Sequence, residues 1–217
     1  MNKTMKIKIC GLRRPQDIQA VNRSRPDYIG FVFAPKSKRY VTPKRAAMLK
    51  AMLSPDIASV GVFVNEEREL IADLLNQDII SIVQLHGQET EEDISWIKRK
   101  TGAPVIKAVS VRERADITRM EESCADFLLF DHGSGGTGQS FDWSLLKGVS
   151  CRKRYFLAGG ISLDNIAKAL AKGAYAVDVS GGAETDGWKD EKKIARFVQL
   201  AHMSRADCME MDSDKRI

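Results

Sequence analysis

The chain has 217 residues, with 34 basic and 29 acidic side chains and a formal net charge of +5. The charges of both signs are interleaved, which argues against a nucleic-acid partner, and a modest positive balance suits a small anionic substrate. No apolar run approaches the length of a membrane span, so we expect no membrane partner and a cytoplasmic location.

Short apolar runs alternate along the chain with segments of helical spacing. Eight runs rich in Ile, Val, Phe and Leu predict strands over Lys6–Cys10, Asp27–Phe33, Ile57–Val64, Ile79–Leu85, Pro104–Val109, Phe127–Phe130, Tyr155–Leu157 and Ala176–Val179. The spacing between them predicts helices over Pro43–Leu53, Glu66–Leu75, Glu91–Arg99, Leu163–Ala171 and Glu191–His202. Thr42 and Asn65 are expected to cap the first two of these helices.

This alternation predicts an α/β fold with parallel strands and right-handed crossovers. Eight units in about 200 residues favour closure into a single (β/α)8 TIM barrel. An open doubly wound sheet is the alternative, but the first strand lacks a GxGxxG turn and an open sheet brings together only the loops at its switch point. No hinge divides the chain, so we expect a catalytic barrel over 1–203 and a polar tail over 204–217.

Several strands end at residues capable of acid–base chemistry. Cys10 ends the first strand and Asp131 ends the sixth, and in a barrel both face the mouth formed by the carboxyl ends of the strands. A lone cysteine is more often an inert buried side chain, and an aspartate at a strand end is often a turn cap. A thiol and a carboxyl across one pocket would form a proton-transfer pair, beneath a glycine-rich loop over 133–138 suited to folding over a ligand.

Other strand ends carry features suited to binding anions. Gly159 and Gly160 follow the seventh strand, and Ser180 and Gly181 follow the eighth, where the loops of many barrels bind phosphate. Arg39, in a basic loop after the second strand, could hold a carboxylate with two hydrogen bonds.

His86 and the cysteines are less informative. His86 after the fourth strand could orient a ligand or only hydrogen-bond within the barrel. The four cysteines form no CxxC pair and no cluster with zinc spacing, so we expect reduced thiols and no metal site.

Seven sequence pieces, in order between Lys6 and about Phe197, resemble those of phosphoribosylanthranilate isomerases, a family of tryptophan biosynthesis. They are Lys8-Ile9-Cys10-Gly11, Gly30-Phe31-Val32-Phe33 with Ser37-Lys38-Arg39, Val60 to Asn65, Val83 to Gly87, Gly135 to Gly138 with Phe141-Asp142-Trp143, Leu157 to Gly160, and Asp178-Val179-Ser180. Arg13, Arg14, Gln139 and Gly181 stand where the commonest family pattern has other residues.

The resemblance implies an isomerase that needs no cofactor and acts on a small phosphorylated substrate, as a monomer or a homodimer. It implies that Cys10 is the general base, that Asp131 is the general acid and that Arg39 binds the anthranilate carboxylate in an Amadori rearrangement. It further implies that the last two loops, with Gly159, Gly160, Ser180 and Gly181, bind phosphate.

The sequence also leaves two other function classes open, and it predicts one contact between charged side chains inside the barrel. A non-catalytic phosphosugar-binding barrel would not need both Cys10 and Asp131, and a Schiff-base aldolase would use Lys8 or Lys107. Because side chains alternate along a strand and the first and last strands of a barrel are neighbours, we expect Lys8 to pair with Asp178 inside the barrel. The alternative is that one or both extend to the bottom rim.

Overall fold

The computed structural model describes residues 5–132, 142–148 and 151–203. Within them, eight parallel strands close into a barrel in which β1 pairs with both β2 and β8. The strands are β1 (Lys6–Cys10), β2 (Tyr28–Val32), β3 (Ala58–Phe63), β4 (Ile82–Leu85), β5 (Val105–Ser110), β6 (Phe127–Asp131), β7 (Arg154–Leu157) and β8 (Ala176–Val179). The predicted TIM barrel is confirmed, and the open-sheet alternative is wrong.

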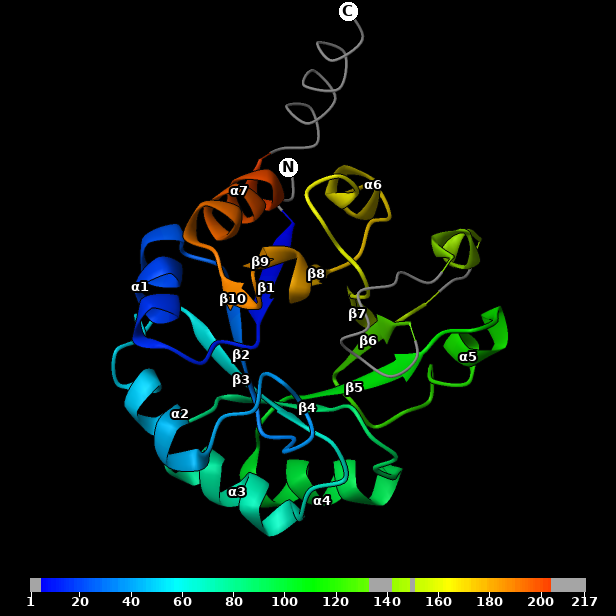
Figure 1. Cartoon of the computed structure of the whole chain (residues 1–217). Helices are drawn as coiled ribbons and strands as arrows, with labels where there is room; N and C mark the ends of the chain where they lie inside the picture. The colour runs from blue at the N-terminus through cyan, green and yellow to red at the C-terminus, as the bar shows by residue number, and fades with distance from the viewer. Residues whose placement is uncertain (1–4, 133–141, 149–150, 204–217) are drawn as a thin grey trace, which may run out of the picture.

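Helices surround the barrel on the outside (Figure 1). They are α1 (Pro15–Ser24), α2 (Pro43–Lys50), α3 (Arg68–Asn76), α4 (Glu91–Thr101), α5 (Arg114–Thr118), α6 (Ile166–Leu170) and α7 (Glu191–His202), with 3₁₀ turns η1 (Trp143–Leu146) and η2 (Gly181–Ala183). A short hairpin of β9 (Glu184–Thr185) and β10 (Trp188–Lys189) follows β8. The glycine-rich loop over 133–138 and the expected tail over 204–217 lie outside the described residues.

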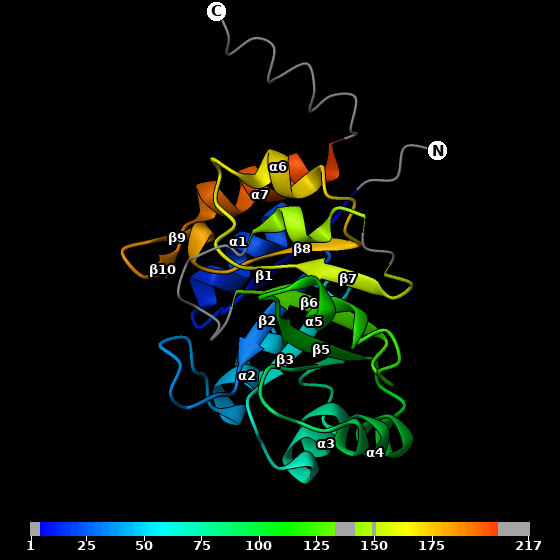
Figure 2. The same cartoon turned by 90° about the vertical axis from the view of Figure 1, so that its right-hand side faces the viewer.

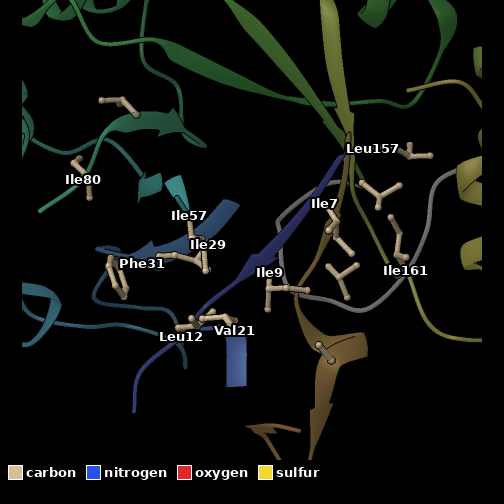
Figure 3. Packing of buried hydrophobic residues seen from close by; sticks show 14 of the residues in the cluster. Ile7, Ile9, Leu12, Val21, Ile29, Phe31, Ile57, Ile80, Leu157 and Ile161 are labelled. Carbon is tan, nitrogen blue, oxygen red and sulfur yellow. The ribbon is translucent and has the colours of Figure 1, made fainter. Parts of the chain in front are cut away.

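Alternation along the strands divides the apolar core into two parts. Ile7 and Ile9 of β1 are fully buried on its outer side, among side chains that pack beneath the helices (Figure 3). The opposite faces of the strands fill the interior with a second cluster, composed of Tyr28, Val60, Ile82, Ile106, Leu129, Phe156, Ala158 and Ala176. The interior is therefore a packed core and not a pore, and in barrels of this kind ligands bind at the carboxyl ends of the strands.

The local sequence signals differ in how well they predict the helix starts. Thr42 caps α2 as predicted, because its Oγ1 accepts from the backbone N–H of Arg45 at 3.2 Å. The prediction for Asn65 is wrong, since α3 begins only at Arg68. The Asn65 Oδ1 instead accepts from the backbone N–H of Gln88 at 2.7 Å, which ties together the segments that follow β3 and β4.

No helix in the described part of the chain is long and apolar enough to cross a membrane.

Asp27, at the amino-terminal end of the barrel, links three segments of the chain. Its carboxylate accepts from Lys6 Nζ at 2.9 Å and from the Ile7 backbone N–H at 2.9 Å, and it lies 3.0 Å from His202 Nε2. Burial raises the pKa of Asp27, but the hydrogen bonds from His202, Lys6 and Ile7 outweigh burial and lower this pKa from 3.8 to about 2. The ionised form is therefore favoured by folding.

This arrangement predicts a loss of stability in acid. Because the folded pKa of Asp27 lies below the unfolded one, its contribution is present above about pH 4 and is lost as the pH falls to about 2. We expect the wild-type free energy of unfolding to fall by about 2 kcal/mol more over this interval than that of Asp27→Asn. Urea unfolding at a series of pH values measures this, and equal pH slopes in the two proteins would contradict it.

Candidate active site

Cys10 lies at the carboxyl end of β1 and faces the barrel interior, where it packs against Val32 and Val62. Its partner in the strand register is Gly30 of β2. A Cβ atom on Gly30 would lie 2.7 Å from the Cys10 Sγ, so only glycine leaves room for the thiol at this position. The sequence of β2 thus makes space for the Cys10 thiol of β1.

Beneath Cys10, Lys8 and Asp178 form a buried ion pair. The Lys8 Nζ lies 2.9 Å from the Asp178 Oδ2, and the Lys8 side chain is 0% exposed. Burial lowers the pKa of Lys8, but Asp178 and Cys10 together outweigh burial and raise it. The predicted pairing inside the barrel is confirmed, and extension of these side chains to the bottom rim is excluded.

The charge state of Cys10 depends on opposing influences. Burial raises the pKa of the thiol, while the ammonium groups of Lys8 and Lys189 oppose that rise. Lys8 is balanced by Asp178, whose own charge acts in the same direction as burial. A thiolate at this position therefore needs cationic support.

Asp131 and His86 form a second group at the barrel mouth, on β6 and just after β4. The His86 Nε2 lies 3.5 Å from the Asp131 Oδ2, and the His86 Nδ1 lies 3.0 Å from the Gln84 Nε2. Burial raises the pKa of Asp131, although His86 opposes this, and burial lowers the pKa of His86. Both groups are thereby shifted toward their neutral forms, and a neutral carboxyl can donate a proton.

Arg39 is already paired in this structure. Its Nε and Nη2 donate to the two carboxylate oxygens of Glu184 at 2.6 and 2.9 Å, and both side chains are nearly buried. The Glu184 Oε1 also accepts from the Lys189 Nζ at 2.8 Å. Burial raises the pKa of Glu184, but hydrogen bonds from Arg39 and Lys189 outweigh burial and lower this pKa to about 2.

Sequence reasoning missed Glu184 and Lys189, which the β9–β10 hairpin brings to the mouth. Figure 2 shows this hairpin on the same side of the barrel as the segment between β2 and α2. Asp186 and Gly187 both have positive φ, 51° and 78°, as a type I′ hairpin turn requires. The Asp-Gly pair is a recognised hairpin signal and could have predicted the turn.

Arg13 and Arg14 brace this end of the barrel. Their guanidinium carbons lie 4.3 and 4.4 Å from the centroid of the Trp188 ring. Arg13 also donates to the backbone oxygens of Lys38 and Gly187, both at 2.7 Å. These contacts connect the segments after β1 and β2 to the hairpin.

The predicted anion-binding turns lie side by side, since β7 and β8 are paired. Gly159 and Gly160 have φ values of +85° and +58°, a conformation that favours glycine. The Ser180 Oγ donates to the Cys10 backbone oxygen at 3.3 Å, which places the eighth turn beside the end of β1. The turn after β8 thus lies next to Cys10, and the turn after β7 follows the strand that pairs with β8.

The lysines considered for a Schiff base are both engaged in ion pairs. Lys107 neighbours Ile106, which faces the interior, so strand alternation directs Lys107 outward. Its Nζ lies 2.8 Å from the Glu89 carboxylate and 2.9 Å from the Gly87 backbone oxygen. A Schiff-base lysine needs a neutral amine at the mouth, and neither Lys8 nor Lys107 fits that requirement.

Among residues 5–132, 142–148 and 151–203, no group of three or more His, Cys, Asp or Glu side chains is arranged to hold a metal ion. The described cysteines Cys10, Cys124 and Cys151 are free thiols.

Comparisons with known proteins agree with this geometry. The model of the family described as N-(5'phosphoribosyl)anthranilate (PRA) isomerase matches residues 7–200. The N-(5'-phosphoribosyl)anthranilate isomerase of Endomicrobium trichonymphae is 45% identical over 200 residues, covering 90% of this chain and 97% of that protein.

Two solved structures of phosphoribosylanthranilate isomerases are also similar to this chain. The crystal structure of phosphoribosyl anthranilate isomerase from Thermotoga maritima is 38% identical, with a TM-score of 0.83 over 91% of this chain and 98% of that one. An isomerase in complex with reduced 1-(o-carboxyphenylamino)-1-deoxyribulose 5-phosphate is 37% identical, with a TM-score of 0.81 and the same coverage. With its barrel, its paired strand ends and its match over nearly the whole described chain, this protein belongs to the phosphoribosylanthranilate isomerase family.

Proposed function

We propose that this protein converts N-(5-phosphoribosyl)anthranilate to 1-(2-carboxyphenylamino)-1-deoxyribulose 5-phosphate, an Amadori rearrangement in tryptophan biosynthesis. Family membership supports the reaction and a small phosphorylated substrate. The observation that carries the assignment of roles is the placement of Cys10 and Asp131 at one barrel mouth, with burial raising the pKa of the Asp131 carboxyl.

The first step of the proposed mechanism opens the ribose ring. Asp131, whose pKa is raised by burial, donates the proton of its protonated form to the ring oxygen as the bond between that oxygen and C1 breaks. The lone pair on the anthranilate nitrogen forms a double bond to C1, which leaves a positively charged imine. No oxidant or reductant is consumed.

The second step moves a proton from carbon. The Cys10 thiolate removes the proton on C2, and the electron pair of that C–H bond forms a double bond between C1 and C2 while the nitrogen regains its lone pair. The resulting enolamine tautomerises to the ketone, with a proton added at C1 and one lost from the C2 hydroxyl. Acid and base each act once.

Binding is assigned to the remaining groups at the mouth. Arg39 would hold the anthranilate carboxylate through the Nη1–Nη2 edge of its guanidinium, since its Nε–Nη2 edge is paired with Glu184. Gly159, Gly160, Ser180 and Gly181 would hold the phosphate, supported by the pairing of β7 with β8. His86 is proposed to orient the substrate next to Asp131.

Two measurements test the function. Expression of the chain in a tryptophan auxotroph that lacks this isomerase is expected to restore growth, and the purified protein is expected to convert the substrate to a product that chromatography separates. A folded, expressed protein that achieves neither would contradict the proposal.

Removal of the Arg39 side chain is expected to weaken substrate binding. A charge-assisted bidentate contact contributes on the order of 2 kcal/mol, so Arg39→Ala is expected to raise KM by roughly 30-fold with a smaller change in kcat. Glu184 keeps Lys189 as a partner in this variant, which limits the damage to the fold. Arg39→Lys is expected to recover activity only in part, because one ammonium cannot replace two edges of a guanidinium. Steady-state kinetics measure this, and an unchanged KM would remove Arg39 from its proposed role.

The assembly and the location of the protein are also proposals. We propose a monomer or a homodimer with no nucleic-acid or membrane partner, acting in the cytoplasm. A Thermotoga maritima relative that is 36% identical is described as dimeric, which supports the second possibility. Light scattering on the purified protein distinguishes the two states.

A further inference from the structure

The charges around Arg39 form a compact group, here called the hairpin cluster, made of Arg39, Glu184 and Lys189. Glu184 contacts both cations, at 2.6 Å from the Arg39 Nε and at 2.8 Å from the Lys189 Nζ. The Lys189 side chain is only 1% exposed, and those of Arg39 and Glu184 are 7% and 8% exposed. Burial lowers the pKa of Lys189, and Glu184 and Cys10 oppose that fall. With both cations charged, two cations and one carboxylate leave this buried group with one formal positive charge in excess.

The hairpin cluster adjoins the end of β1. A Cβ atom on Gly11 would lie 2.3 Å from the Arg39 Cδ, so the arginine side chain crosses directly over the residue that follows Cys10. The Lys189 Nζ donates to the Ser180 backbone oxygen at 2.9 Å, and the Ser180 Oγ donates to the Cys10 backbone oxygen at 3.3 Å. The β9–β10 hairpin thus delivers a buried ammonium to the segment that holds Cys10.

The other charged groups that face Cys10 do not supply this excess. Lys8 below the thiol lowers the pKa of Cys10 more than Lys189 does, but Asp178, 2.9 Å from the Lys8 Nζ, opposes it, and the formal charges of that pair sum to zero. Asp131 and His86 come from β6 and the end of β4, and their pKa shifts favour the neutral forms of both. Three groups of charged or titratable side chains therefore surround Cys10. The Lys8–Asp178 pair has no net formal charge, the Asp131–His86 pair is shifted toward its neutral forms, and the hairpin cluster has one formal positive charge in excess.

Burial by itself opposes a thiolate, because a charged sulfur loses its hydration in the barrel interior. The proposed reaction nevertheless needs the thiolate, since only that form removes a proton from carbon. In a medium of low effective dielectric constant, an excess charge near the thiol has a larger influence on this equilibrium than it would have in water.

We propose that Lys189, fixed by Glu184 and the Ser180 backbone oxygen, is a positioning residue that gives the hairpin cluster its excess positive charge, and that this charge supports the thiolate form of Cys10. This inference rests on the proposed role of Cys10 as the base and adds a task for the β9–β10 hairpin. Glu184 then limits how far the hairpin cluster lowers the pKa of Cys10, because its carboxylate cancels one of the two positive charges.

Two substitutions that change the charge in opposite directions test the proposal. Lys189→Met lowers the formal charge of the hairpin cluster from +1 to 0, and Glu184→Gln raises it to +2 while keeping the side-chain shape. We expect the apparent pKa of Cys10 to rise by roughly one pH unit in the first variant and to fall by a similar amount in the second. The pH dependence of alkylation by iodoacetamide, read by mass spectrometry on the peptide that contains Cys10, measures this pKa in the substrate-free enzyme.

Kinetics give a second readout. The acidic limb of the kcat/KM profile is expected to shift with the alkylation pKa, so that Lys189→Met loses about tenfold near neutral pH and recovers at higher pH. Lys193→Met is the matched control, because Lys193 also contacts Glu184, at its backbone oxygen and at 2.7 Å, but lies on α7. We expect it to leave the Cys10 pKa unchanged.

If the hairpin had a purely structural role, the Cys10 pKa would shift in the same direction in Lys189→Met and Glu184→Gln. That result, or an unchanged Cys10 pKa in both variants, would overturn the proposal. The alkylation measurement needs no substrate. Failure of the proposed reaction would appear in the wild-type protein as absent isomerase activity, whatever the Cys10 pKa, so the two failures are distinguishable.

Discussion

Cys10→Ala and Asp131→Asn are each expected to lower kcat by roughly 10²-fold or more, because a positioned acid or base typically contributes about 10² to 10⁴. Cys10→Ala removes the group that takes the C2 proton. Asp131→Asn keeps the shape of the side chain but removes the proton that opens the ring. Neither change removes a member of the Lys8–Asp178 pair or of the Arg39–Glu184–Lys189 group, so both proteins are expected to fold.

Steady-state kinetics with circular dichroism measures these effects. Cys124→Ala serves as the control, because Cys124 is an exposed thiol. Turnover close to wild type in a folded Cys10→Ala or Asp131→Asn protein would remove that residue from its role. Loss of activity in both, with the control unaffected, would support the acid–base pair.

The second large effect concerns stability rather than turnover. Lys8→Met leaves the Asp178 carboxylate buried in the barrel interior without the cation that lies 2.9 Å away. An unpaired buried charge is strongly unfavourable, so this substitution is expected to lower the free energy of unfolding by roughly 3 kcal/mol. The Lys8→Met/Asp178→Leu double variant is expected to recover much of that loss, because an apolar pair carries no desolvation penalty.

Denaturant unfolding of the two single variants and the double variant completes the cycle. The expected signature is a coupling energy, with the double variant more stable than the sum of the two single effects implies. Additive losses would show that the pair contributes nothing beyond its separate parts. The readout is equilibrium stability, so any change in Cys10 chemistry in these variants does not affect it.

The local sequence was sufficient for the order of the eight barrel strands and for the strand ends that matter most. The apolar runs at Lys6–Cys10 and Ala176–Val179 match β1 and β8 at both ends. Short strands bounded by glycine turns carry a strong local signal, and alternation within them predicts which side chains face inward. Once the barrel closes, the Lys8–Asp178 pair follows from that alternation and from the neighbouring positions of the first and last strands.

Some boundaries were lost where local and tertiary signals compete. The expected strand over Ile79–Leu85 begins only at Ile82, because the backbone N–H groups of Ile79 and Ile80 donate to the Leu74 oxygen at the end of α3. Ile79 and Ile80 are both buried, as they would be in a strand, but their backbone N–H groups donate to the end of α3 and not to the sheet. An apolar run by itself does not distinguish these two uses of buried side chains.

The pairing of Arg39 was decided only by the tertiary structure. In sequence, Arg39 belongs to an exposed-looking basic loop, and its partner Glu184 lies 145 positions away. Contacts of this separation depend on how the barrel closes and on a two-stranded hairpin, neither of which leaves a periodic pattern near Arg39. Periodicity and turn chemistry act over a few residues and therefore predict the elements and the ends of the strands. The excess charge beside Cys10 depends on three side chains from distant segments, so it appears only when the folded chain brings them together.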